Sequence, residues 1–132
     1  MTNKRETSFA AGETALLFVD VQKIFCTPGI DPAHPEFGPD HYYHRRLKET
    51  VIPNQVLLLE KARASRIQVM HTIIEALTED CRDASLDHRL SDLMVPKGHP
   101  LAGPIDELAP IANEIVLPKT SSGVFNSTNI DY

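Results

Sequence analysis

The stretch TALLFVDV, residues 14–21, is a near-continuous apolar run that contains a single charged residue, Asp20. Runs of this kind are typical of strands that are buried on both faces, as in parallel sheets covered by helices. Two further runs follow, IQVMHTII at 67–74 and EIVLPK at 114–119. The three runs predict three strands of one sheet.

The segments between these strands carry helical and loop patterns. Residues 41–65 have helical spacing, and Pro53 either kinks this helix or starts its second half. Residues 26–40 are rich in proline and glycine, which predicts an irregular loop. Shorter helices are expected at 85–93 and 104–113, and a last one is expected to begin after Ser127 or Asn126 as its N-cap. The candidate apolar positions of the long helix are Leu47, Val51, Val56, Leu57, Leu59 and Ala62.

Alternating strands and helices predict a three-layer α/β fold with a parallel sheet and right-handed crossovers. At 132 residues the chain has room for one domain. We expect a polar lead-in over 1–13 and the domain over 14–132.

Composition limits the kinds of partner and compartment. The formal net charge of −5 argues against nucleic acid and anionic membrane surfaces, which select for clustered Lys and Arg. No apolar run is long enough to span a bilayer. Two cysteines without CxxC spacing do not form a disulfide framework, so we expect a reducing, cytoplasmic compartment.

Asp20 and Lys119 stand at the carboxyl ends of two predicted strands, where parallel sheets bind their ligands. An aspartate there is costly to bury unless it is paired, and a lysine on another strand would supply the partner. One interpretation is a structural ion pair or a helix cap. The other is an aspartate that moves protons, with a lysine that keeps it ionised or stabilises an oxyanion.

Three segments in order resemble the isochorismatase-like cysteine hydrolases. ALLFVDVQKIF resembles the family's opening strand with its D-x-Q element, and VLPKTSSGVFNSTNIDY resembles the strand that ends in the catalytic lysine. Between them, HTIIEALTEDCRDASLDHRLSDLMVPKG is most similar to the amidohydrolase branch with ureidoacrylate, biuret and N-carbamoylsarcosine hydrolases. The resemblance runs from about Thr14 to Tyr132.

The resemblance implies a hydrolase that cleaves a C–N bond of a small amide or ureido compound through an Asp-Lys-Cys triad, without a cofactor. Asp20 would be the general base and Lys119 its cationic partner. The family's cysteine nucleophile lies after one more helix and strand, so this chain is expected to stop before it. The resemblance also implies a homo-oligomer that binds a small-molecule substrate.

Several other residues are candidates near the same site. Supporting or substrate-binding roles are plausible for Gln22, Thr72, Glu75, Ser121, Ser122 and Phe125, although each could equally be loop scaffolding. Cys26 and Cys81 are weak candidates for a substitute nucleophile, because Cys81 lies among carboxylates and Cys26 has no helix N-terminus behind it. His34, His41 and His44 do not match a metal-ligand spacing, so no metal is expected. His71, within a strand, is interpreted as a core or pocket-edge histidine.

Two alternative functions stay open at this point. The chain could be an inactive, truncated remnant that serves as a binding or assembly module. It could also belong to the branch that cleaves the vinyl ether of isochorismate and needs no thiol.

Overall fold

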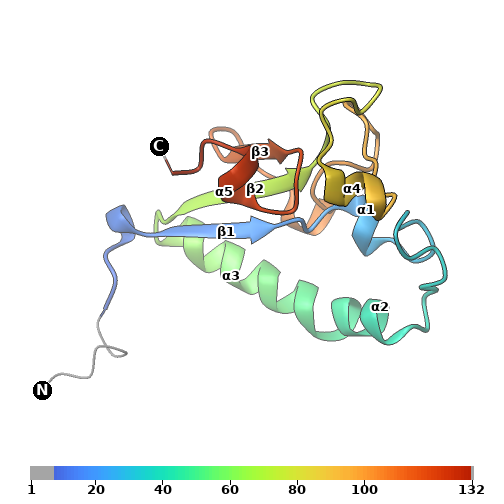
Figure 1. The fold of residues 1–132 in the computed structure, drawn as a ribbon. Helices are drawn as coiled ribbons and strands as arrows, with labels where there is room; N and C mark the ends of the chain where they lie inside the picture. Colours follow the sequence, from blue (N-terminus) through green and yellow to red (C-terminus); the bar gives the residue numbers. More distant parts are fainter. Residues whose placement is uncertain (1–7, 132) are drawn as a thin grey trace, which may run out of the picture.

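The computed structural model describes residues 8–131 and contains one parallel three-stranded sheet (Figure 1). Its strands are β1 (Ala15–Val19), β2 (Gln68–Ile74) and β3 (Ile115–Lys119), with β2 in the middle. In the register, Val19 lies opposite Thr72, and Ile74 lies opposite Lys119. All three predicted strands are therefore confirmed, and so is the α/β fold. The predicted lead-in contains the 3-10 turn η2 (Ala11–Glu13), and residues 1–7 lie outside the described part.

The long helix forms as one continuous but irregular segment. It consists of α2 (Tyr42–Arg46), the π-helical turn η3 (Leu47–Val51) and α3 (Ile52–Ala64). Pro53 stands in the first turn of α3, so it starts the second half of the helix. The residues just before it, Val51 and Ile52, are themselves helical, so the segment continues through the proline. In the π-helical turn before the proline, the Ile52 N–H group donates to the Leu47 carbonyl, five residues back.

The main core lies between the sheet and α3, which crosses one face of the sheet (Figure 1). It is built from Phe18, Leu59, Ala62, Val69, Ile105 and Leu108. Leu57 was expected on this buried face, but its side chain is 53% exposed. The prediction for Leu57 is wrong because Leu59 and Ala62 define the face that packs on the sheet, and Leu57 points away from it.

The remaining helical pieces are shorter than predicted. Helix α1 (Lys23–Cys26) was not predicted and ends where the predicted loop at 26–40 begins. Helix α4 (Leu86–Leu90) replaces the helix expected at 85–93, and the 3-10 turn η4 (Asp106–Leu108) replaces that at 104–113. A second core cluster, Ile24, Ile74, Val95 and Ala102, packs α1 and the loop after α4 against the carboxyl end of β2. Figure 1 shows α1 and α4 beside the carboxyl ends of the strands.

The helix expected to begin at Ser127 is instead α5 (Val124–Ser127), which ends there. Gly123 is its N-cap, and Thr128 is already extended, with φ −139° and ψ 175°. The Ser127 hydroxyl donates to the Gly123 carbonyl at 3.0 Å, and the Thr128 hydroxyl donates to the Val124 carbonyl at 2.7 Å. The Ser127 hydroxyl binds a preceding carbonyl, whereas a cap would accept from a following N–H group, and Asn126 lies within α5. The N-cap prediction is therefore wrong for both residues.

None of the helices in residues 8–131 has both the length and the apolar character that a membrane crossing requires.

Candidate active site

Asp20 follows the last residue of β1 and has a left-handed backbone, with φ 57°. Aspartate tolerates this conformation better than most residues, although it still costs on the order of 1 kcal/mol. The Asp20 N–H group donates to the Thr72 carbonyl at 3.1 Å, which extends the pairing of β1 and β2 by one residue. The chain therefore leaves the strand at Asp20, and the Asp20 carboxylate lies at the carboxyl edge of the sheet.

Lys119 ends β3 and is fully buried. Its Nζ lies 2.7 Å from Oδ2 of Asp20 and also donates to the carbonyls of Ser122, at 3.1 Å, and Ser121, at 3.4 Å. An ammonium has three N–H donors, and three acceptors surround this one. The predicted contact between Asp20 and Lys119 is therefore present, with every lysine donor engaged.

Thr72, on the central strand, completes the arrangement. Its hydroxyl donates to Oδ1 of Asp20 at 3.1 Å, and the residue is 1% exposed. The carboxyl end of each strand thus supplies one side chain, and Asp20, Thr72 and Lys119 form a row across the sheet. In this row the Asp20 carboxylate lies between the Thr72 hydroxyl and the Lys119 ammonium. This arrangement fixes the orientation of the carboxylate, as a positioned proton acceptor requires.

A cavity of about 450 Å³ opens beside Asp20. Its walls come from α1, the loop at 27–41, α2, the end of β2 and the loop after α4. The lining residues are Asp20, Phe25, Asp31, Ala33, His34, Phe37, Tyr43, Ile74 and Leu93. This size suits a small organic molecule, and the combination of aromatic walls with a few carboxylates is typical of small-molecule sites.

Gln22 does not face this cavity, although it was a candidate for a supporting role. Its side chain is fully buried and forms three hydrogen bonds. Nε2 donates to the carbonyls of Ile74 at 3.0 Å and Ala102 at 2.6 Å, and Oε1 accepts from the Ile74 N–H group at 2.7 Å. Gln22 therefore supports the site by joining the ends of β1 and β2 to the loop around Ala102.

Four other predicted residues lie outside the cavity lining. Glu75 accepts a hydrogen bond from the Gly98 N–H group at 2.9 Å and so holds a loop. Ser121 and Ser122 contact Lys119 through their backbone carbonyls. Phe125 is 71% exposed. The first three act on the conformation of the loops around the site, whereas Phe125 contributes to neither the cavity nor the ion pair.

Helix α4 is fastened to the loop that follows Lys119. The Ser122 hydroxyl donates to Oδ2 of Asp87 at 2.6 Å, and the Ser85 hydroxyl donates to Oδ1 of the same carboxylate. These two hydrogen bonds hold the pKa of Asp87 well below its usual range. His88, next along the helix, is 2% exposed. Burial lowers the pKa of its imidazole and outweighs the opposite effect of the Asp87 charge.

The two cysteines lack the environment of a nucleophile. Burial raises the pKa of the Cys26 thiol to about 11, with a further contribution from Glu107. Burial also raises the pKa of Cys81, followed by the charges of Asp83 and Asp80. Both thiols are therefore protonated at neutral pH, and neither lines the cavity beside Asp20.

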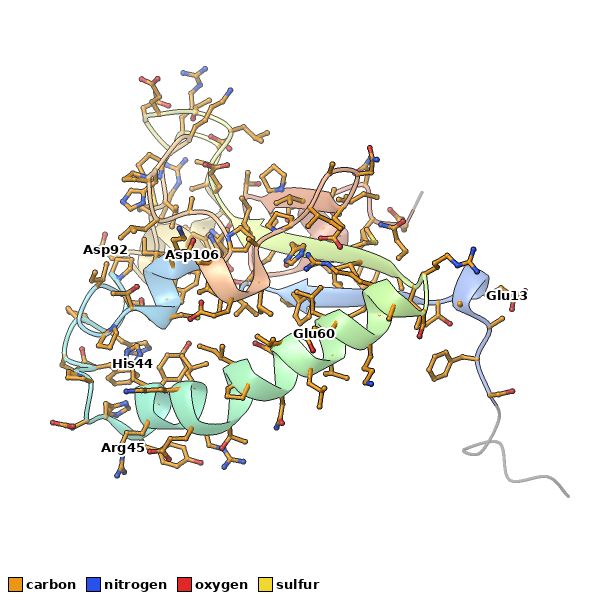
Figure 2. All side chains as sticks on the ribbon, turned by 180° about the vertical axis from the view of Figure 1, so that it is seen from behind. Glu13, His44, Arg45, Glu60, Asp92 and Asp106 are labelled. Atoms are coloured by element: carbon orange, nitrogen blue, oxygen red, sulfur yellow. The ribbon has the colours of Figure 1, made fainter. Side chains whose placement is uncertain are left out.

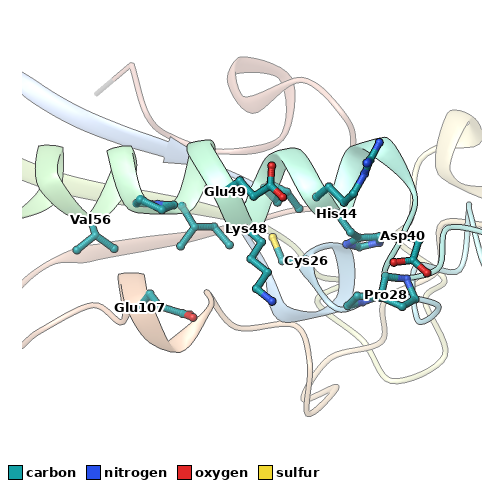
Figure 3. Close-up of a pocket in the computed structure, with 13 residues that line it drawn as sticks. Cys26, Pro28, Asp40, His44, Lys48, Glu49, Val56 and Glu107 are labelled. Atoms are coloured by element: carbon teal, nitrogen blue, oxygen red, sulfur yellow. The ribbon is translucent and has the colours of Figure 1, made fainter.

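A larger cavity, of about 1,020 Å³, lies behind α1, between the long helix and η4 (Figure 3). Figure 3 shows Cys26 and Lys48 projecting into it, with Glu107 on the opposite wall. His44 and Arg45 also line it, and His44 is 5% exposed, whereas Arg45 lies on the exposed side of the helix (Figure 2). We place the candidate active site in the smaller cavity because it is lined by Asp20, the carboxylate that pairs with Lys119.

The histidines of the first loop are arranged by stacking. The Phe37 ring lies between the rings of His34 and His41, at centroid distances of 4.5 and 3.8 Å. His71, on β2, stacks on Phe18 at 5.4 Å, in the core as interpreted from the sequence. Within residues 8–131, no three His, Cys, Asp or Glu side chains converge in a way that could hold a metal ion.

The row of Asp20, Thr72 and Lys119 could be anticipated from strand ends, but the cavity walls could not. Asp31, Phe37 and Tyr43 come from a loop and a helix whose fold depends on tertiary contacts. No local pattern in the sequence marks these residues as neighbours of Asp20.

Comparison with known proteins places this geometry in a family. Residues 14–132 match the model of the isochorismatase domain. No match was found among the curated proteins. A cysteine hydrolase from Pseudomonas syringae pv. phaseolicola has a similar structure, with a TM-score of 0.70 and 25% identity over 93% of this chain and 54% of that chain.

Two further structures agree. An isochorismatase family protein from Desulfovibrio vulgaris gives a TM-score of 0.65 and 28% identity, over 89% of this chain and 58% of that chain. An isochorismatase-like hydrolase from Alkaliphilus metalliredigens gives 0.57 and 23%, over 89% and 55%, and supports the fold alone. The chain thus spans little more than half the length of these relatives. With the match over 14–132, the chain belongs to the isochorismatase family.

Proposed function

We propose that this chain carries the Asp–Lys part of a cysteine hydrolase site that cleaves a C–N bond of a small amide or ureido compound. The observation that carries the proposal is the contact of Asp20 with Lys119, at 2.7 Å, beside a cavity of small-molecule size. The middle segment, 71–98, supports the amide and ureido class through its resemblance to amidohydrolases.

In this mechanism Asp20 accepts the proton of a cysteine thiol, and the thiolate attacks the carbonyl carbon of the substrate. The C–N bond breaks, the amine leaves with a proton, and water then hydrolyses the thioester or thiocarbamate. Lys119 holds the carboxylate in place throughout, because its other two donors are anchored on backbone carbonyls. The raised pKa values of Cys26 and Cys81 make neither of them a suitable nucleophile, so the proposal requires a different thiol.

A small thiol supplied in solution tests the part of the site that the chain contains. The reaction is thiolysis of N-acetylimidazole, an activated amide, by 2-mercaptoethanol, followed by the loss of its ultraviolet absorbance. The chain should accelerate the reaction catalytically. Because a positioned general base contributes roughly 10²–10⁴-fold, Asp20→Asn should lower the protein-dependent rate by at least about tenfold.

Glu60→Gln is the matched control, since Glu60 is an exposed carboxylate on α3, away from the cavity (Figure 2). It should keep the full rate. An acceleration that Asp20→Asn leaves intact, or no acceleration at all, would contradict the proposal.

A further inference from the structure

Asp31 is a second carboxylate in the cavity that contains Asp20. The residue is only 9% exposed. Its Oδ1 accepts a hydrogen bond from the Ala33 N–H group at 2.9 Å, and no protein donor to Oδ2 is present within residues 8–131. Asp31 therefore has acceptor capacity directed at the cavity.

The charges of the two carboxylates are compensated differently. Both oxygens of Asp20 are engaged, one by Lys119 and one by Thr72. Within the described part of the chain, no Lys, Arg or His nitrogen lies within 4.0 Å of the Asp31 carboxylate. The Oδ2 atom of Asp31 is open to the cavity, so a cation bound there would pair with the one carboxylate of the lining that has no cationic partner in the described residues.

The aromatic walls favour the same kind of ligand. Phe25 and Tyr43 line the cavity, and a positive charge is attracted to the face of an aromatic ring. Phe37 also lines it, but His34 and His41 stack on its two faces. Burial raises the pKa of Tyr43 to about 12, with smaller contributions from Cys26 and Asp31, so its phenol stays protonated and adds no competing negative charge. His34 is the one basic residue of the lining. Its exposed side chain lies 3.5 Å from the carboxylate of Glu36.

We propose that the cavity selects substrates in which the amide or ureido group is joined to an ammonium or guanidinium group, and that Asp31 binds this cation. The inference rests on the proposed function for the amide or ureido part, which would lie at Asp20. Asp31 is then the residue that determines specificity, since it accepts N–H groups and rejects a carboxylate.

Three ureas of matched length test the selection. They are 4-ureidobutylammonium, butylurea and 4-ureidobutyrate, which carry a positive, a neutral and a negative end group. Isothermal titration calorimetry on the full chain should give affinities in that order. Because a partly buried charge pair is worth on the order of a factor of ten in binding, the cation should bind about tenfold tighter than butylurea.

Asp31→Asn should abolish this order, because asparagine keeps an oxygen for the Ala33 N–H group but loses the charge. Glu13→Gln, at the opposite end of the molecule from Asp92 and the carboxyl edge of the sheet, is the control and should keep the order (Figure 2). Urea denaturation of each variant establishes that it is folded.

The outcomes separate this inference from the proposed function. Equal binding of all three ureas, or tighter binding of the anion, would overturn the role of Asp31 and leave the ureido site standing. An order that survives in Asp31→Asn would also overturn it. Failure of all three ureas to bind would count against both proposals.

Discussion

The Lys119 side chain is the most constrained charged group of the described chain. It has no solvent exposure, and its ammonium contacts one carboxylate and two backbone carbonyls. Its energetic role depends on Asp20, whose side chain is 23% exposed and so keeps part of its hydration. Ion pairs of this kind contribute little net stability when intact, but are costly when only one partner is removed.

Lys119→Met should therefore destabilise the fold by about 2–4 kcal/mol, a value discounted for the partial exposure of Asp20. The loss has two sources, an unpaired carboxylate and two carbonyls without a donor. Urea denaturation followed by circular dichroism measures it. Lys61→Met, at an exposed position of α3, is the control and should change the stability by less than about 0.5 kcal/mol.

The double variant Asp20→Asn/Lys119→Met distinguishes a charge effect from a packing effect. Removing both charges should restore part of the stability lost in Lys119→Met, because no unpaired charge is left. A double variant that is less stable than Lys119→Met by the full cost of Asp20→Asn would show that the two side chains are energetically independent, contrary to the contact in the structure.

Among the elements, the ends of β1 and β2 and the loop around Ala102 are joined by one side chain. The amide of Gln22 donates to two carbonyls, those of Ile74 and Ala102, and accepts from one N–H group. A backbone bridge between Gln22 and Pro104 runs beside it. These contacts connect the carboxyl ends of β1 and β2 to the loop around Ala102.

Gln22→Glu is expected to destabilise the fold by about 2–4 kcal/mol at neutral pH, since it replaces a donor facing two carbonyls by an acceptor. Thermal and urea unfolding measure the effect. Gln68→Glu makes the same chemical change at an exposed position and should be close to neutral. Equal losses for the two variants would mean that the three hydrogen bonds of Gln22 are not what stabilises this edge.

The same residues show how far the sequence predicts the structure. The strands and the ion pair follow from local patterns, since apolar runs mark buried parallel strands and their ends share one edge. The hydrogen bonds of Gln22 could not be predicted in this way, because its partners lie 52 and 80 residues away in the sequence. Helix α5 was misplaced because Ser127 can either cap a following helix or bind a preceding carbonyl, and only the folded chain selects between them.

Across the whole molecule, two buried histidines couple folding to pH. His71 and His88 are 1% and 2% exposed, and the Nε2 atom of each has no hydrogen-bond partner within residues 8–131. Burial lowers the pKa of both below the ordinary value of 6.5. For His71 the charge of Glu114, whose carboxylate lies 3.9 Å from Nε2, acts in the opposite direction but is outweighed by burial.

The sign of the pH dependence follows from the proton balance. Below pH 6.5 the unfolded chain binds protons at these two histidines, whereas the folded chain does not until their lowered pKa values are reached. Stability should therefore be fully present above pH 6.5 and decrease as the pH falls, by at most about 1.4 kcal/mol per pH unit for each histidine. Urea denaturation at several pH values between about 5 and 8 measures this slope.

His71→Leu removes one titrating group from the core and should reduce the slope by about half. Its stability at pH 8 is compared separately, so that a packing defect is not mistaken for a change in slope. A stability that is flat from pH 8 to about pH 5, or an unchanged slope in His71→Leu, would mean that the buried imidazoles take up protons in the folded chain as readily as in the unfolded one.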